Sequence, residues 1–145
     1  NGSKGEGVYK CKNEQEVKEI FSKENSPLLI QEFIENDGDI RVFVIGNTIQ
    51  GAIKRSTTNT SEFRNNVSLG GTAKTHTLSE TEAEIALTAA KSLQYEVAGV
   101  DLISDKDGKI YVMEVNRAPQ FNGFMQATEI DIPYKILEFL LSKYN

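Results

Sequence analysis

Hydrophobic and polar residues are arranged in two ways along this chain, and the two patterns predict short strands and amphipathic helices. Six short runs read as strands: residues 8–12, 28–34, 39–45, 48–54, 97–103 and 110–115. Three other segments are predicted to be helices: residues 14–23, 80–93 and 132–144. We expect residues 28–34 to form a buried strand, because this mostly apolar run follows a break at Ser26-Pro27.

Capping signals support the first two helices. Asn13 and Ser79 are good N-cap residues, and Glu16 and Glu82 follow three residues later as capping-box partners. The second and third helices each have an apolar stripe, which we expect to pack in the core. The two stripes are Ile85, Ala86, Ala89, Ala90 and Leu93, and Ile136, Leu137, Leu140 and Leu141.

Two hairpins are predicted from short turn sequences. Gly46-Asn47 connects the runs at 39–45 and 48–54, and Asp107-Gly108 connects those at 97–103 and 110–115. Helices and hairpins alternate without the regular rhythm of βαβ units. The sequence therefore predicts an α+β domain with a mainly antiparallel sheet and flanking helices.

The second hairpin contains candidate metal ligands. A two-residue turn at Asp107-Gly108, counted outward, sets Asp101 opposite Glu114, and Asn116 shares a face with Glu114 by the period of two. Opposed carboxylates on apolar strands repel each other and lose hydration, so the arrangement favours a cation between them. Because all the donors are oxygens, Mg²⁺ or Mn²⁺ suits the site better than zinc does.

The metal interpretation depends on the length of the turn. A four-residue turn would keep the face, whereas a three-residue turn would flip one strand and weaken the case. The alternative is an ordinary turn flanked by solvated charges. A calcium loop at residues 105–108 is a weaker alternative, because Ile103 occupies the position where an EF-hand needs its first aspartate.

Composition excludes several classes of function. The 145 residues suffice for about one domain with a real core, and the net charge of −5, without a basic stripe, argues against nucleic acid as a partner. There is no apolar run long enough to span a membrane and no signal peptide at the start. The single cysteine, Cys11, excludes an internal disulfide and fits a reducing cytoplasm, where we expect the protein.

Two loops are candidates for binding anions. The chain opens on a glycine-rich turn at residues 1–8 that matches neither the P-loop nor the dinucleotide fingerprint, and because no strand precedes it we expect the chain to be a fragment. The polar segment at residues 55–71 contains Arg55 and Arg64, which suit anionic groups, and Gly70-Gly71, which permits close backbone approach. The alternative for this segment is a surface loop without function.

A series of short motifs runs in a defined order along almost the whole chain. After the glycine loop come Gln31-Glu32-Phe33-Ile34, Asp39-Ile40-Arg41, Phe63-Arg64-Asn65-Asn66, Gly70-Gly71, Ala98-Gly99-Val100-Asp101 and Glu114-Val115-Asn116. This series resembles the ATP-grasp superfamily, most closely its RimK-type amino-acid ligases. The resemblance implies a partial ATP-grasp fold, with residues 1–33 in the smaller lid subdomain and residues 34–145 in the larger, metal-binding one.

The resemblance also implies how the nucleotide is held. Glu32 and Phe33 match the hinge whose backbone meets the adenine, and Ile34 lines the pocket. Asp39 resembles the acidic residue that accepts hydrogen bonds from the ribose. The glycine loop, with Gly5 and Gly7, is expected to hold phosphate.

The resemblance also implies a catalytic centre, which the later motifs would form. Arg64, Asn65 and Asn66 match an Arg-Ser-Asn segment that reaches the phosphates and the active centre, with asparagine in place of the serine. Arg64 and Asn66 are the candidate catalytic residues. The expected magnesium ligands are Asp101, Glu114 and Asn116, for which the hairpin argument speaks independently.

The resemblance implies a ligase that uses ATP and two Mg²⁺ or Mn²⁺ ions to join a carboxylate to an amine through an acyl phosphate. The expected partners are an amino acid such as glutamate and a protein, peptide or small-molecule acceptor; oligomerisation of the full-length protein is left open. The alternative is a nucleotide-binding or regulatory module that keeps the fold without ligase turnover.

Three departures from the family pattern bear on this interpretation, and one of them is Asn65 in place of the serine. The strand with a phosphate-binding lysine that precedes the glycine loop in the family is missing here. Arg117 follows Asn116 where many relatives have serine, which leaves the substrate open.

Overall fold

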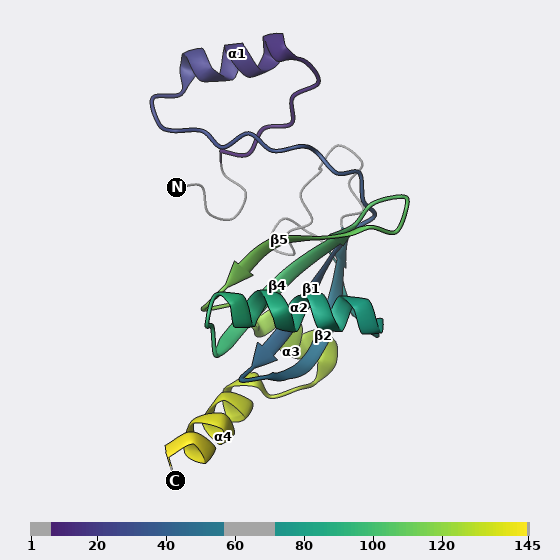
Figure 1. The fold of residues 1–145 in the computed structure, drawn as a ribbon, viewed down its shortest axis with the longest axis vertical. Coiled ribbons are helices and arrows are strands. Elements are labelled where there is room, and N and C mark those ends of the chain that lie inside the picture. The colour runs from purple at the N-terminus through teal and green to yellow at the C-terminus, as the bar shows by residue number, and fades with distance from the viewer. Residues whose placement is uncertain (1–6, 57–71, 145) are drawn as a thin grey trace. The chain divides into compact units, whose positions relative to one another are not determined.

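The structure is a computed structural model that describes residues 7–56 and 72–144. The chain forms two compact units, which divide between Glu35 and Asn36. Figure 1 shows the elements of each unit along the chain. Each unit is described by itself.

The first unit contains one helix, α1 (Glu14–Lys23). Asn13 caps it as predicted, since its side chain accepts a hydrogen bond from the Glu16 N–H at 3.0 Å. The predicted strands at 8–12 and 28–34 are wrong: neither run is a strand, and Leu29 is 82% exposed. A strand needs a hydrogen-bonded neighbour, and no described residue of this unit pairs with either run.

The second unit is built on a five-stranded sheet, and all of its strand pairs are antiparallel. The strands are β1 (Asp39–Ile45), β2 (Thr48–Ser56), β3 (Thr72–Thr75), β4 (Val97–Ser104) and β5 (Ile110–Asn116), and their order across the sheet is β3-β2-β1-β4-β5. The predicted hairpin at Gly46-Asn47 is confirmed, because Ile45 pairs with Thr48. The predicted α+β class is confirmed as well.

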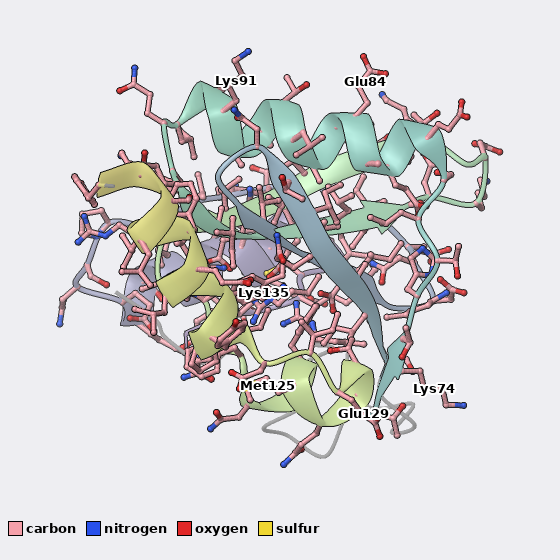
Figure 2. All side chains as sticks on the ribbon, turned by 90° about the horizontal axis from the view of Figure 1, so that it is seen from below. Lys74, Glu84, Lys91, Met125, Glu129 and Lys135 are labelled. Carbon is pink, nitrogen blue, oxygen red and sulfur yellow. The ribbon has the colours of Figure 1, made fainter. Side chains whose placement is uncertain are left out.

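Helices cover both faces of this sheet. On one face lies α2 (Glu80–Ser92), which begins with the predicted Ser79–Glu82 capping box. Figure 2 shows Glu84 and Lys91 pointing away from the sheet on the outer side of this helix. On the opposite face lie α3 (Asn122–Thr128) and α4 (Ile132–Tyr144), so the sheet is the middle layer of three.

Two cores flank the sheet. Alternate residues of the strands point to opposite faces, so each strand contributes to both. The core on the α2 side contains Ile40, Val42, Val44, Ala52, Ala86, Ala90, Ala98, Val100 and Leu102. The core on the other side contains Phe43, Ile45, Ile53, Phe124 and Ile132.

The two helical stripes are only partly in the core. On α2, Ala86 and Ala90 are buried as predicted, but Leu93 is half exposed at the C-terminal end of the helix. On α4 the prediction is largely wrong, since three of the four residues are exposed: Leu137, Leu140 and Leu141. The helix packs on the sheet with a different side, which contains Ile132, Ile136 and Phe139.

The turn between β4 and β5 has three residues rather than the predicted two. The Asp105 N–H donates to the Lys109 carbonyl at 3.0 Å, and the Gly108 N–H donates to the Asp105 carbonyl at 3.1 Å, so residues 106–108 form the loop. Gly108 has a φ of +81°, which glycine adopts without strain. The consequence for the candidate metal ligands depends on how β5 pairs beyond the turn.

None of the helices in the described part of the chain combines the length and the apolar character needed to cross a membrane.

Candidate active site

The strand register brings charged side chains together on the face of the sheet that α3 and α4 cover in part. Asp39 of β1 pairs with Arg55 of β2, and Arg41 of β1 pairs with Asp101 of β4. Asp101 in turn pairs with Glu114 of β5. Because directly paired residues share a face, four neighbouring strands contribute to one polar group.

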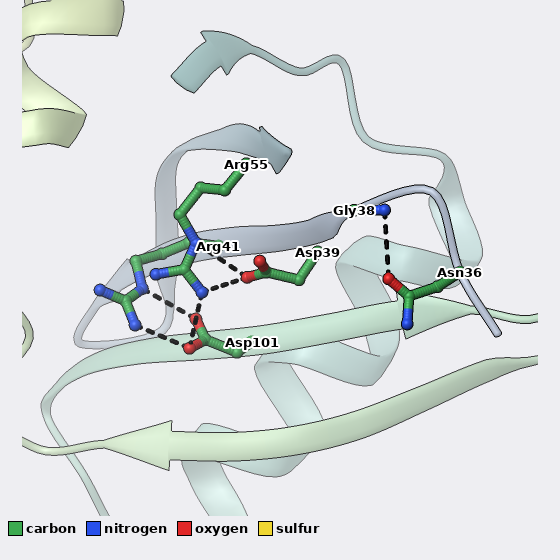
Figure 3. Close-up of polar contacts among 6 residues, drawn as sticks. All are labelled: Asn36, Gly38, Asp39, Arg41, Arg55 and Asp101. Atoms are coloured by element: carbon green, nitrogen blue, oxygen red, sulfur yellow. Dashed lines mark hydrogen bonds and ion pairs between the residues drawn. The ribbon is translucent and has the colours of Figure 1, made fainter. Parts of the chain in front are cut away.

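Four of these side chains form a closed ion cluster (Figure 3). Arg41 donates from Nε to Oδ1 of Asp101 at 2.8 Å and from Nη2 to Oδ2 at 2.7 Å. Arg55 donates from Nε to Oδ2 of Asp39 at 2.8 Å, and its Nη2 bonds the same oxygen. The Nη2 of Arg55 also reaches Oδ2 of Asp101 at 3.0 Å, so this arginine links β2 to β1 and β4.

Burial makes the cluster energetically significant. Asp39, Arg55 and Asp101 are all less than 9% exposed, and two cations balance two anions. Burial raises the pKa of Asp39 above its ordinary value, since the loss of water outweighs the attraction of Arg55. Burial alone would lower the pKa of Arg55, but the carboxylates of Asp101 and Asp39 outweigh it and raise that pKa. Arg55 therefore stays positively charged within the sheet face.

The predicted pairing of Asp101 with Glu114 is confirmed, although the turn has the wrong length for it. A three-residue turn alone would set Asp101 opposite Met113. The register shifts between Asp101 and Leu102, so that Leu102 pairs with Val112 and Met113 is left as an extra residue of β5. This β-bulge cancels the effect of the turn and returns Glu114 to the face of Asp101.

The predicted metal ligands therefore lie on one face of two adjacent strands. Glu114 is exposed, and Asn116, two residues along β5, is half-buried and pairs with Gly99. Within residues 7–56 and 72–144, no group of three or more His, Cys, Asp or Glu side chains forms a ready-made metal site. The donor set fits a hard cation all the same, because it combines two carboxylates with an amide oxygen.

Gly99 allows the segment after β5 to cross close to the sheet. A Cβ atom on Gly99 would lie only 2.6 Å from Cβ of Pro119 and 3.8 Å from Nε of Arg41. Pro119 is buried, and Gly99 pairs with Asn116 at the end of β5. The close packing of Pro119 on Gly99 therefore fixes the chain directly after a predicted metal ligand.

We expect Gly99→Ala to lower the free energy of unfolding by about 1–3 kcal/mol, because the added methyl group forces Pro119 outward. Chemical denaturation followed by circular dichroism measures this loss. The added cost should shrink in a background that carries Pro119→Gly, which removes the opposing Cβ atom. Purely additive effects of the two substitutions would contradict the packing argument.

The other predicted binding residues are not all described. In the first unit, Gly7, Glu32 and Phe33 are exposed and Ile34 is half-buried; the ammonium of Lys10 lies 3.5 Å above the ring of Phe33. Four residues lie outside the described part of the chain: Gly5, Arg64, Asn65 and Asn66. Their assigned roles stay predictions.

Sequence reasoning missed the role of Arg41. It treated this residue only as part of a motif, yet Arg41 lies directly across from Asp101 and bonds both of its oxygens. A signal was present, since Arg41 follows Asp39 by two residues and so shares its face of the strand. Asp39 pairs its carboxylate with Arg55, and its predicted contact with a ribose stays a prediction.

Comparison with known proteins agrees with this geometry. The sequence profile of the RimK-like ATP-grasp domain matches residues 1–140. The chain is 45% identical over 144 residues to a probable alpha-L-glutamate ligase of Trichodesmium erythraeum, a match that covers 96% of this chain and 48% of the relative. A probable alpha-L-glutamate ligase of Haemophilus influenzae is 39% identical over 145 residues, covering 97% of this chain and 47% of the relative. The chain spans about half the length of these relatives.

Solved structures share the fold at lower identity. A Chryseobacterium gregarium RiPP-associated ATP-grasp ligase, in complex with ADP and a leader and core peptide, aligns with a TM-score of 0.74 at 19% identity, over 92% of this chain and 41% of that one. The ATP-grasp ligase PsnB, complexed with minimal precursor, Mg and ADP, aligns with a TM-score of 0.62 at 22% identity, over 77% of this chain and 33% of that one. These structures share the fold, and the profile match over residues 1–140 shows that the chain belongs to the RimK-like ATP-grasp domain family.

Proposed function

We propose that this chain is the ATP- and Mg²⁺-binding catalytic part of a ligase that joins the carboxylate of one substrate to the amine of another. The observation that carries the proposal is the set of oxygen donors from Asp101, Glu114 and Asn116 on one sheet face, next to the guanidinium groups of Arg41 and Arg55. Such a face can bind a cation and the anion that accompanies it. Phosphoryl transfer from ATP needs both kinds of group.

The proposed reaction has two steps. A carboxylate oxygen of the first substrate attacks the γ-phosphorus of ATP, the bond to the β-γ bridging oxygen breaks, and ADP leaves. The amine of the second substrate then attacks the acyl carbon, inorganic phosphate leaves, and the nitrogen loses a proton. No side chain has to act as a nucleophile in either step.

The residues of the face have distinct proposed tasks. Asp101, Glu114 and Asn116 would hold two magnesium ions, which when bound neutralise the charge that develops on the phosphates. Arg41 and Arg55 provide positive charge beside them. Arg64 and Asn66 are proposed to reach the transferred phosphoryl group, while Gly5, Gly7 and Asn65 are proposed phosphate contacts. The adenine and ribose roles of Glu32, Phe33, Ile34 and Asp39 are carried over as proposals.

The substrates are proposed from the relatives. The matching proteins of Trichodesmium and Haemophilus are named probable alpha-L-glutamate ligases, which supports glutamate as the amino acid. The structural neighbours in complex with a leader and core peptide or a precursor support a peptide or protein as the other substrate. A small-molecule acceptor is the alternative.

The decisive test is formation of ADP by the full-length protein, supplied with Mg·ATP, L-glutamate and a panel of peptides. We expect ADP only when Mg²⁺, glutamate and a competent peptide are all present. Glu114→Gln should reduce the rate at least about 100-fold, because it removes an anionic ligand of the proposed magnesium ions, which neutralise the phosphates. The matched control is Glu84→Gln, which removes another exposed carboxylate, on the outer side of α2.

The outcomes separate the two candidate functions. Mg·ATP binding without any glutamate- or peptide-dependent ADP would indicate a nucleotide-binding module without ligase turnover. An equal rate for the Glu114→Gln and Glu84→Gln proteins would remove Glu114 from the site.

A further inference from the structure

The two arginines of the ion cluster hold Asp101 in different ways. Arg41 places Nε on one oxygen of Asp101 and Nη2 on the other, at 2.8 and 2.7 Å, which is the two-point geometry of a strong charge-assisted pair. Arg55 gives Asp101 a single bond of 3.0 Å and keeps two bonds to Asp39. If Asp101 turned to another partner, Arg55 would keep its main carboxylate.

Arg41 bonds no second carboxylate within residues 7–56 and 72–144. Among the described residues, Asp101 is the acceptor of its side-chain hydrogen bonds. Three N–H donors from the two arginines already act on the two oxygens of Asp101, which together offer about four lone-pair positions. A divalent cation that binds Asp101 must therefore displace N–H donors from these lone pairs, and the positive charge of Arg41 repels it.

We propose that Arg41 is a positioning residue that competes with the divalent cation for Asp101. In the absence of metal, Arg41 neutralises and orients the buried carboxylate. Binding of the cation takes Asp101 from Arg41 and frees the Nε and Nη2 donors for an anion that arrives with the metal. The inference rests on the proposed function, because it requires that Asp101 be a metal ligand.

This competition predicts two opposite effects of replacing Arg41: a lower stability of the metal-free protein and a higher affinity for the cation. Replacing Arg41 by glutamine leaves Asp101 with Arg55 alone, so the metal-free protein should lose thermal stability. The same substitution removes the competing charge, so a cation should bind more tightly. A purely structural Arg41 would give the opposite result for the metal, because a disordered site binds more weakly.

The test is titration of the full-length protein with Mn²⁺ alone, followed by electron paramagnetic resonance of the free ion. We expect Arg41→Gln to bind Mn²⁺ at least about fivefold more tightly than the wild type. Its melting temperature without metal should fall, and the rise produced by Mn²⁺ should be larger than for the wild type. The gain in affinity should disappear when Glu114→Gln is added, which assigns it to this site.

Lys54→Gln is the matched control. Lys54 precedes Arg55 on β2, so it points to the opposite face of the sheet, where it pairs with Asp37 at 2.6 Å. Its substitution removes one positive charge from the same strand pair and should leave Mn²⁺ affinity unchanged. An equal gain in Lys54→Gln would overturn the proposal, because net charge alone would then explain the effect.

Other outcomes are equally decisive. Unchanged or weaker Mn²⁺ binding by Arg41→Gln, or no binding by either protein, overturns the proposal. Arg41→Lys provides the test if the glutamine variant does not fold: it keeps the charge but loses the two-point bond, and we expect a smaller gain. Unchanged or weaker binding by that variant overturns the proposal too.

Failure of this inference is distinguishable from failure of the proposed function. If the wild type forms ADP with Mg²⁺ and glutamate but Arg41→Gln shows no gain in affinity, only the competition is wrong. If ADP formation does not depend on Mg²⁺ and Glu114, the metal site itself is wrong.

Discussion

Replacement of Asp101 by asparagine is expected to reduce ADP formation by the full-length protein at least about 100-fold, because the proposed cation site loses its most buried anionic ligand. Asp101 is 5% exposed, and its carboxylate accepts hydrogen bonds from both Arg41 and Arg55. The measurement is the rate of ADP release at saturating Mg·ATP and glutamate with a competent peptide present. An unchanged rate would remove Asp101 from the metal site.

The same substitution also disturbs the ion cluster, so a loss of activity needs a structural control. Asparagine leaves the buried guanidinium of Arg55 and the part-buried one of Arg41 with less negative charge, and breaking a buried pair costs about 3–5 kcal/mol. Circular dichroism of Asp101→Asn decides whether the protein is folded at the assay temperature. If it is not, Glu114→Gln is the better probe, because Glu114 is exposed and loses no ion pair of the cluster.

A loss of stability of about 3–5 kcal/mol is expected from Phe43→Ala. Phe43 is completely buried at the centre of β1, and its ring lies 5.3 Å from that of Phe124 on α3, tilted by 51°. Truncation removes this contact and leaves a cavity between the sheet and α3. The shift of the midpoint in urea denaturation measures the effect.

Leu137→Ala is the control for that prediction. Leu137 has the same apolar character but is 53% exposed on the outer side of α4, so we expect a change within about 0.5 kcal/mol. Comparable losses for the two variants would mean that Leu137 is covered and that the assignment of the core face of α4 is wrong.

Local signals predicted most of the second unit. The turn at Gly46-Asn47 and the capping box of Ser79 with Glu82 act between residues a few positions apart, so the sequence alone specifies them. The antiparallel character of the sheet followed from these hairpins. The short elements β3 and α3 were not predicted, since neither has a strong periodic pattern of its own.

The errors arise where a neighbouring element decides the outcome. Residues 28–34 have the composition of a strand, but pairing depends on a second chain segment that composition does not reveal. On α4, apolar residues occur on more than one side, so the pattern could not choose between Leu137 and Ile136 as the side that meets the sheet. Tertiary packing made that choice.

At the candidate site, too, local signals led to correct predictions, and the packing of neighbouring elements decided what was missed. Pairing of Asp101 with Glu114 was predicted correctly, but from a turn that is one residue too short. Glu114 lies on the predicted face only because of the β-bulge at Met113, and no sequence pattern in β5 predicts this bulge. The link from Arg41 to Asp101 required knowing that β1 and β4 are neighbours, which the order of elements along the chain does not give.

The bulge at Met113 gives the strand before Glu114 one residue more than the pairing needs. Deleting one residue of the turn leaves Asp105 paired with Lys109 across a two-residue loop, so β5 keeps its register and Glu114 stays opposite Asp101. Deleting Met113 removes the bulge and also keeps Asp101 opposite Glu114, whereas deleting Val112 as well turns Glu114 to the opposite face. This strand segment therefore tolerates the loss of one residue, but not of two, without moving the acidic face.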